Sequence, residues 1–253
     1  MLKKKMIMLV AAAMMTLSAS SAFAALADFE LIRVVYERGS GSTETVTDLG
    51  NVNTIIANGG GTFAGTGAFT ATTPANLAVA YFAFDGTNGA LWASSNTGLT
   101  AGDTTTATSG FTGVASYYNS NTVTKGTTTT GQAYGIGLQS AIMSYKNKLS
   151  ATAGTLSNAF LPVDGIEKSL SSLVGANSGS VSQTLYYWAN AYGSYELTPA
   201  LQLAANTGAV AATITTNFDG STNVTVTPIP PAFFLMGSGL LGMFGLRRKN
   251  KVA

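Results

Sequence analysis

The chain has no cysteine and no histidine among its 253 residues, and only 9% of its residues are charged. The lack of cysteine excludes disulfides, thiol catalysis and thiolate metal sites. The lack of histidine removes the commonest general base and the commonest transition-metal ligand, so a Ser-His-Asp triad cannot form within this chain. We therefore expect no enzymatic activity, no catalytic residues, no bound metal and no cofactor.

The few charges are unevenly distributed along the chain. Between residues 25 and 228 there are six Lys and Arg residues and all eleven acids, which gives that part a formal net charge of −5. The remaining bases lie at the two ends and produce the overall value of +2. Binding to DNA or RNA needs clustered Lys and Arg. The acidic middle of the chain therefore argues against a nucleic-acid partner.

The first 24 residues have the three parts of a secretory signal peptide. Three lysines at 3–5 precede an apolar run at 6–17, which is too short to span a bilayer comfortably. Ala22 and Ala24 then satisfy the A-x-A rule for signal peptidase. We predict cleavage after Ala24, so that the mature chain starts at Ala25. The alternative is an uncleaved anchor.

The last residues, 228–253, combine a proline motif, an apolar segment and a basic end. Pro228, Ile229, Pro230 and Pro231 precede the apolar residues 232–246, and the basic run 247–251 begins with Arg247, Arg248 and Lys249. As a transmembrane helix the apolar segment covers about 22 Å, against a hydrocarbon core of about 30 Å, so it needs thinning of the bilayer or flanking residues. The positive-inside rule keeps the basic end cytoplasmic. This topology agrees with that set by the signal peptide.

This tail resembles a PEP-CTERM sorting signal, most closely the VPLPA-type variant in which an aliphatic residue, here Ile229, replaces the acid between the prolines. The resemblance covers about a tenth of the chain. It implies an exosortase partner in a Gram-negative bacterium and cleavage near the Pro-x-Pro motif. It also implies transient anchoring on the periplasmic side of the inner membrane, followed by transfer to the cell surface or extracellular matrix. The alternative is a membrane-anchored tail without processing.

Residues 25–227 form one domain that we predict to be mainly β, an antiparallel β-sandwich with one or two short helices. Ile32, Val34 and Tyr36 alternate along a strand that pairs with the segment that follows it. The predicted strands are 29–38 with 43–48, 77–84 with 90–95, 181–195, and 209–217 with 223–229. For 181–195 a helix is the alternative. In the last hairpin Val210, Ala212 and Ile214 are expected to face inward.

Two helices are predicted inside this domain. In 132–150 the apolar residues recur at three and four, and in 164–174 Asp164 and Glu167 have the spacing of a capping box. Residues 58–67 read as a glycine-rich loop, and the Thr-rich segment 100–130 as loops or weak edge strands.

Three kinds of candidate site remain, each with a structural alternative. Trp92, Tyr187 and Trp188 suit glycan stacking, although an aromatic core explains them as well. Pairs of carboxylates are the requirement for glycoside hydrolysis, but most acids here have a local role in a turn, a cap or a strand. Oxygen ligands for calcium occur at Asp85 with Asn88 and at Asp219 with Asn223. The alternative is that each aspartate supports its own turn.

Taken together, these features predict an exported, non-enzymatic structural protein of the cell surface or of a biofilm matrix. Its partners would be signal peptidase, an exosortase, the inner membrane and an exopolysaccharide. A carbohydrate-binding module is the second interpretation, and a carboxylate-dependent hydrolase is the least favoured. The threonine clusters at 104–106 and 127–130 are either O-glycosylation sites or solvated loops.

Overall fold

The computed structural model describes residues 26–38, 43–67, 69, 76–87, 90–95, 104–149, 167–188 and 209–226, with backbone alone at 95, 104–109, 188 and 209. The predicted signal peptide and its cleavage site, and the sorting tail 228–253, lie outside these ranges. Within them, no helix has the length and apolar character that crossing a membrane requires.

One antiparallel sheet accounts for all eleven strands in the described ranges. The strands are β1 (Glu30–Glu37), β2 (Thr43–Asn51), β3 (Gly60–Phe63), β4 (Leu77–Phe84), β5 (Leu91–Ser95), β6 (Thr124–Thr127), β7 (Ala133–Leu138), β8 (Glu167–Ser169), β9 (Ser180–Trp188), β10 (Ala209–Asn217) and β11 (Thr222–Val226). Their order is β3-β11-β10-β9-β5-β4-β1-β2-β7-β6, and β8 pairs with one end of β4. The helices are α2 (Val52–Ala57), α3 (Thr104–Asn119), α4 (Tyr145–Lys148) and α5 (Ser171–Ala176).

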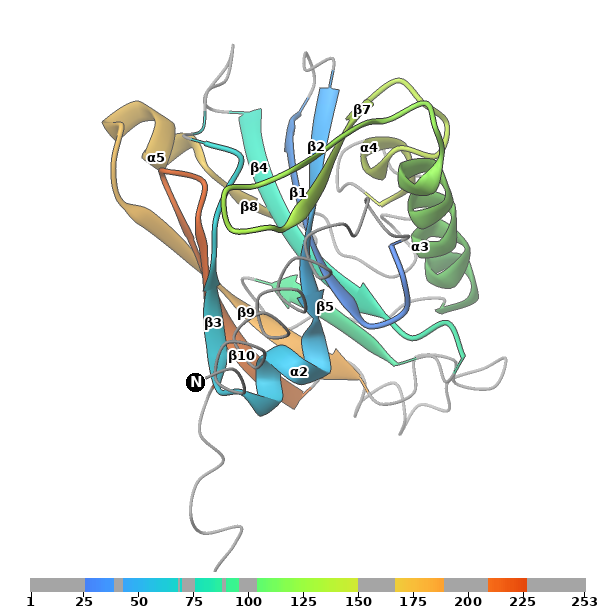
Figure 1. Ribbon diagram of the computed structural model, residues 1–253, viewed down its shortest axis with the longest axis horizontal. Helices are drawn as coiled ribbons and strands as arrows, with labels where there is room; N and C mark the ends of the chain where they lie inside the picture. The colour runs from blue at the N-terminus through green and yellow to red at the C-terminus, as the bar shows by residue number, and fades with distance from the viewer. Residues whose placement is uncertain are drawn as a thin grey trace, which may run out of the picture.

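The sheet curls into a half-barrel, as Figure 1 shows. Arg33 on β1 donates hydrogen bonds to the Gly220 carbonyl and to Thr222 Oγ1 (3.0 Å), although four strands separate β1 from β11 in the sheet order. Tyr81 on β4 shares its hydroxyl with Thr216 (2.7 Å) and with Thr222 (2.9 Å) in the same way. These polar contacts across the hollow hold the curl, and burial lowers the pKa of Arg33 because its charge has lost water.

Each face of the sheet carries its own apolar core. The concave core includes Leu31, Val79, Trp92 and Ile214, with side chains from α2 and α5. On the opposite face α3 and α4 cover β1, β2 and β4 (Figure 1), and Phe111, Val114 and Tyr118 of α3 are buried there. Because strand side chains alternate between faces, a single sheet needs cover on both sides to bury its apolar residues.

The strand pairing agrees with the sequence in four places. β1 pairs antiparallel with β2, and Ile32, Val34 and Tyr36 share one buried face. β4 is a central strand whose residues are buried except Phe84, and it pairs with β5. β9 occupies the first part of the strand predicted at 181–195, whose last residues lie outside the described ranges. β10 and β11 form the predicted hairpin.

The predicted sandwich is wrong in its architecture, because the strands form one curled sheet rather than two stacked sheets. The prediction that Val210 faces inward is also wrong. A register shift between Val210 and Ala212 in the pairing with β9 leaves Val210 exposed while Ala212 and Ile214 remain buried. A bulge of this kind changes the side-chain alternation locally. A glycine-rich loop at 58–67 is likewise only partly correct, since Gly60–Phe63 forms the edge strand β3.

The segment 100–130 contains the longest helix of the described chain, which the sequence analysis missed. α3 runs through Thr, Ser and Gly residues that are poor helix formers in isolation. Phe111, Val114 and Tyr118 nevertheless recur at three and four and bury one face against the sheet. Tertiary packing therefore overrides local propensity here. Only β6, at the end of the sheet, fits the predicted weak edge strand.

The helix predicted at 132–150 is wrong over most of its length. Ala133–Leu138 is the strand β7, and only Tyr145–Lys148 forms a single helical turn, α4. Small residues on β7 let α3 approach the sheet closely. This packing favours a strand here, and the local spacing of apolar residues does not reveal it. A Cβ atom added at Gly137 would lie 2.7 Å from the ring of Tyr117 on α3. Glycine in a strand often marks such a close approach.

The helix predicted at 164–174 is also displaced. Asp164 lies outside the described ranges, Glu167 belongs to strand β8 rather than to a capping box, and the helix α5 begins only at Ser171. Glu167 is 2% exposed and accepts hydrogen bonds from Tyr36 Oη (2.8 Å), Tyr145 Oη (3.0 Å) and both Nε (2.9 Å) and Nη2 (2.7 Å) of Arg38. Its carboxylate therefore accepts hydrogen bonds inside the core and does not cap a helix.

A second buried carboxylate, that of Glu44 on β2, is joined to the first through Tyr145. Glu44 accepts hydrogen bonds from Tyr118 Oη (2.6 Å) and from the backbone amides of Tyr145 (2.6 Å) and Lys146 (3.0 Å). Desolvation raises the pKa of Glu44, although these donors oppose the shift. The Tyr145 amide thus contacts one carboxylate and its hydroxyl the other, which fixes α4 and α3 against the sheet.

We predict that Tyr145→Phe lowers the free energy of unfolding by about 2 kcal/mol, because it removes a buried hydrogen bond to a carboxylate and keeps the ring. Chemical denaturation of both proteins measures this difference. Tyr134→Phe is the control, since the Tyr134 hydroxyl has no hydrogen-bond partner in the part of the chain that is described, and it should change stability by less than about 0.5 kcal/mol. Equal effects of the two variants would contradict the bridging role of Tyr145.

Candidate functional site: a cavity between the sheet and α3

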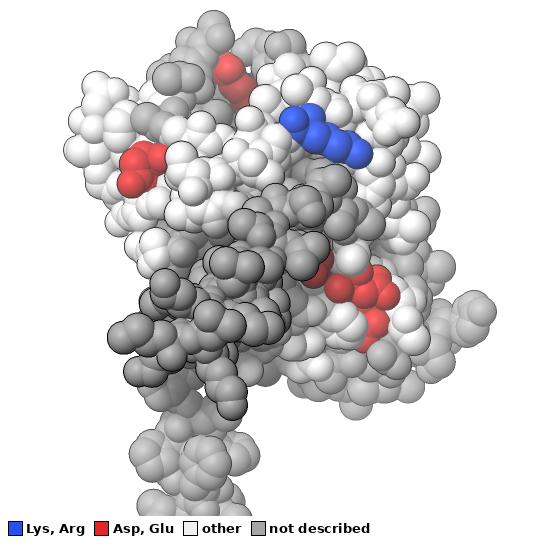
Figure 2. All heavy atoms as spheres, in the orientation of Figure 1, with Lys and Arg blue, Asp and Glu red and all other residues white. Residues whose placement is uncertain are grey.

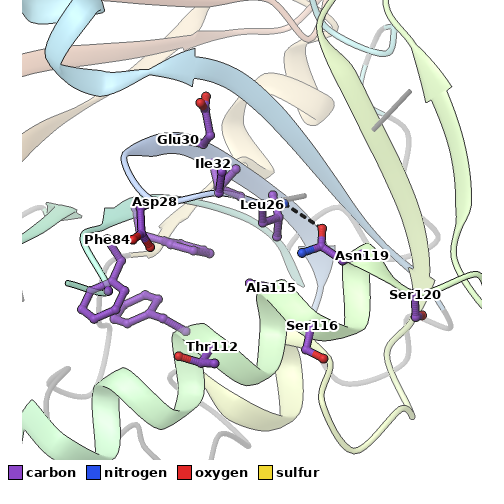
Figure 3. A pocket seen from close by; sticks show the side chains of 14 residues that line it. Leu26, Asp28, Glu30, Ile32, Phe84, Thr112, Ala115, Ser116, Asn119 and Ser120 are labelled. Atoms are coloured by element: carbon purple, nitrogen blue, oxygen red, sulfur yellow. Dashed lines mark hydrogen bonds between the residues drawn. The ribbon is translucent and has the colours of Figure 1, made fainter. Parts of the chain in front are cut away.

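An open cavity of about 640 Å³ lies between the first residues of the domain, the end of β4 and helix α3. This volume is in the range of small-molecule sites. Figure 3 shows the cavity from close by. Its lining residues are Leu26, Ala27, Asp28, Glu30, Ile32, Phe82, Phe84, Gly86, Phe111, Thr112, Ala115, Ser116, Asn119 and Ser120.

Backbone contacts position the segment that precedes β1 along the rim of the cavity. The Leu26 amide donates to Oδ1 of Asn119 on α3 (2.7 Å), the bond drawn in Figure 3. The Phe29 amide donates to the Phe84 carbonyl (2.8 Å). The side chain of Asp28, between these two anchors, lies against Gly86, where an added Cβ would be 2.9 Å from Asp28 Oδ1. Gly86 therefore leaves the space that the carboxylate occupies.

The apolar part of the cavity is aromatic. Phe111 of α3 lies 4.9 Å from Phe82 and 5.7 Å from Phe84, measured between ring centroids, and the ring planes of Phe84 and Phe111 differ by only 15°. Phe82 and Phe111 are buried in the outer core, whereas Phe84 is half-buried at its margin. Leu26 and Ile32 continue this apolar wall. Flat rings give a rigid surface at low cost in side-chain entropy.

The polar part of the cavity comes mainly from one face of α3. Thr112, Ser116 and Ser120 follow one another at four-residue spacing, and Asn119 lies beside them. Thr112 and Ser116 are exposed, while Ser120 donates to the Tyr117 carbonyl (2.6 Å). In Figure 3 the Asn119 amide nitrogen points away from the bond to Leu26 and over the cavity. A row of hydroxyl and amide groups thus borders the aromatic part of the cavity.

The charged residues that line the cavity, Asp28 and Glu30, are both acidic. Within the described ranges the Asp28 carboxylate has neither a hydrogen-bond donor nor an ion-pair partner, and it is exposed. The face of the molecule in Figure 2 is mostly uncharged, with small acidic groups and little basic surface. The cavity therefore favours a neutral or cationic ligand over an anion.

Glu30 borders the same cavity, but its carboxyl group turns away from Asp28 and Phe84 in Figure 3. It is hydrogen-bonded to Asp48 of β2, next to the register shift between Glu30 and Ile32. Burial, together with repulsion from Asp48, raises the pKa of Glu30 to about 7. Desolvation also raises the pKa of Asp48. The prediction that most acids have a local role in a turn, a cap or a strand did not include this pair of acids.

This pair does not have the spacing of glycosidase carboxylates. Retaining enzymes separate the two groups by about 5–5.5 Å and inverting enzymes by about 6.5–9.5 Å, so that a sugar and a water fit between them. A direct hydrogen bond between Glu30 and Asp48 brings the groups closer than either distance. The geometry of the pair is that of two acids sharing a proton at the margin of the sheet.

The residues predicted for glycan stacking do not gather at the cavity. Trp92 is 4% exposed and packs against Phe29 and Tyr187, with ring centroids 5.9 and 4.7 Å apart, so it offers little ring surface to a ligand. Tyr187 is half-buried against the concave core. The backbone of Trp188 pairs with Leu91, and its side chain lies outside the described part. For Trp92 the core alternative is the correct one.

The aspartates considered for calcium support their own turns. Asp85 accepts a hydrogen bond from the Thr87 amide (2.9 Å), and Asp219 accepts from the amide (2.9 Å) and hydroxyl (2.6 Å) of Ser221. The hydrogen bonds from Ser221 lower the pKa of Asp219. Of the two threonine clusters, 104–106 starts α3, whereas 127–130 begins at the last residue of β6 and continues into the turn after it. The predicted signal-cleavage and sorting residues fall outside the described ranges.

The residues that the structure brings together at the cavity were not found from the sequence as a group. The signal was nevertheless present, since Thr112, Ser116 and Ser120 have the spacing of one helical face, with Phe111 adjacent to it. It was missed because the Thr-rich composition around it indicated loops. Comparison with protein-family models, curated proteins and solved structures finds no match for this chain.

We predict that Glu30→Gln stabilises the protein at pH 8 by about 1 kcal/mol, once solvent screening is allowed for, and has a smaller effect at pH 5. The folded pKa of about 7 exceeds the ordinary value of 4.5, so the folded state holds the proton more tightly. The wild-type protein should therefore lose stability as pH rises from about 4.5 through about 7. Thermal unfolding of both proteins between pH 5 and 8 measures the difference, and a gap independent of pH would contradict it.

Proposed function

We propose that this chain is an exported structural protein of the cell surface or extracellular matrix, delivered by a signal peptide and by a PEP-CTERM-like tail. The observation that carries the proposal is the tail itself, with Pro228, Ile229, Pro230 and Pro231 ahead of the apolar segment 232–246 and the basic end. An exosortase would release the protein from its transient membrane anchor near these prolines.

The start of the folded domain fits this processing scheme. Leu26, two residues after the predicted cleavage site, is already part of the fold through its bond to Asn119. The tail would follow β11, which ends at Val226, so only a short connection separates the domain from Pro228. A single domain flanked so closely by both signals is consistent with a cargo protein whose ends serve for delivery.

Replacing Pro228, Pro230 and Pro231 together by Ala should leave the tail uncleaved and keep the protein in the inner-membrane fraction. The prolines set the extended backbone ahead of the helix that a processing enzyme would read. Intact-mass measurement of protein recovered from membrane, surface and medium fractions gives both the cut position and the distribution.

Pro74→Ala is the matched control, since it changes a proline of the central region and leaves the tail intact. It should be processed and distributed like the wild type. Deleting the exosortase should reproduce the triple-proline phenotype. Normal processing of the triple variant, or an unchanged distribution without the exosortase, would refute the sorting mechanism.

Carbohydrate binding is the second candidate function, and the cavity beside α3 favours it. A sugar ring presents apolar C–H faces and hydroxyl groups at its edge. The cavity offers the matching surfaces, an aromatic wall that includes Phe84 and the polar groups of Thr112, Ser116 and Asn119. These surfaces support the α3 cavity, and not Trp92, as the candidate glycan site.

A further inference from the structure

We propose that the cavity between β1, β4 and α3 binds an amino sugar in its cationic, non-acetylated form, with the ammonium group at Asp28 and the ring against Phe84. The inference deepens the carbohydrate-binding candidate above and rests on it, because it names the class of sugar. Its three supports are the Asp28 carboxylate, which has no partner within the described ranges, the aromatic wall and the polar face of α3.

The Asp28 carboxylate supplies the charge. It is held at the rim between the anchored residues Leu26 and Phe29, and Gly86 leaves room for it. None of the cavity-lining residues is Lys or Arg, so no internal cation competes with a ligand there. A charge-assisted hydrogen bond between an ammonium and a carboxylate is about twice as strong as a neutral one. The cavity therefore discriminates between an amine and its acetylated form.

The aromatic wall and the polar face of α3 orient the rest of the sugar ring. Phe84 is half-buried at the margin of the core and offers its ring to C–H groups, and the buried ring of Phe111 stacks against it and holds it in place. Thr112 and Ser116, on the same helix as Phe111, are exposed one helical turn apart and can exchange hydrogen bonds with hydroxyls. A simple alkyl amine would use the carboxylate and the wall but leave these hydroxyls without a ligand partner. The combination selects a hydroxyl-bearing amine.

The volume limits the ligand to a short segment of a chain. A cavity of about 640 Å³ that is open on one side accommodates a small molecule, and a longer chain would leave through the open side. The acidic rim would repel uronic acids and phosphorylated sugars. The best occupant is thus one or two glucosamine-type units of a polymer whose amines are free.

The test is a calorimetric titration of the purified full-length chain, held in detergent, with four-unit oligomers of glucosamine, N-acetylglucosamine and glucose. These probes differ at one position of the ring. We expect glucosamine oligomers to bind at least about tenfold more tightly than the other two, and the preference to shrink as salt rises. Hexylamine measures the contribution of an ammonium without the ring and should bind about tenfold more weakly than the glucosamine oligomer.

Three variants locate the binding. Asp28→Asn should remove the preference for the amine, a loss of at least about tenfold in affinity, and should leave binding of glucose oligomers unchanged. Ser116→Leu places an apolar side chain on the exposed helix face and should weaken all sugars by blocking the cavity. Asp219→Asn is the matched control, because Asp219 is exposed in the β10–β11 turn and does not line the cavity. It should bind like the wild type.

Equal affinity for the amine and its acetylated form, or full binding by Ser116→Leu, would overturn the proposal. An absence of binding to every probe would overturn it as well. None of these results bears on sorting, which the tail variants test separately. Conversely, a result that refutes the sorting mechanism would not change the affinities measured for the sugars.

Discussion

Tyr145 joins two buried carboxylates, those of Glu44 and Glu167, in one network, and the packing of the helices α3 and α4 on the sheet depends on it. Its amide donates to Glu44 and its hydroxyl to Glu167, while Tyr36 and Arg38 donate to Glu167 as well. A buried carboxylate is costly unless donors replace its water. Because these donors come from β1, α3 and α4, satisfying the two acids fixes the helices against the sheet.

On the concave side of the sheet the buried charge is positive and belongs to Arg33. Arg33 is 1% exposed and bonds to hydroxyl and carbonyl oxygens of β2, β11 and the β10–β11 turn, with no carboxylate bonded to it within the described ranges. Together with Tyr81 it joins strands that are far apart in the sheet order. The curl thus follows from polar groups that must find partners in a small interior, as much as from the apolar residues around them.

The cavity is a consequence of how α3 sits on the sheet. Small residues on β7 let one end of the helix approach closely, whereas Phe111 near its middle rests on Phe82 and Phe84 at the end of β4. The residues from Leu26 to Asp28 border the remaining space. A domain without histidine or cysteine can still recognise a ligand in such a space, since binding needs shape, an apolar surface and a few fixed polar groups.

The sequence by itself determined the strands with strong alternation or continuous apolar runs, namely β1 with β2, β4 with β5, and β10 with β11, because their periodicity and turns are local properties. The terminal signals that we propose are likewise read from the sequence alone. Only the tertiary structure decided that α3 is a helix, that 133–138 is a strand, and that Glu167 belongs to the core. Each of these depends on a partner distant in the chain, whose burial outweighs weak local preference. The same holds for the cavity, since Asp28, Phe84 and Ser116 meet only when the sheet and the helix have packed.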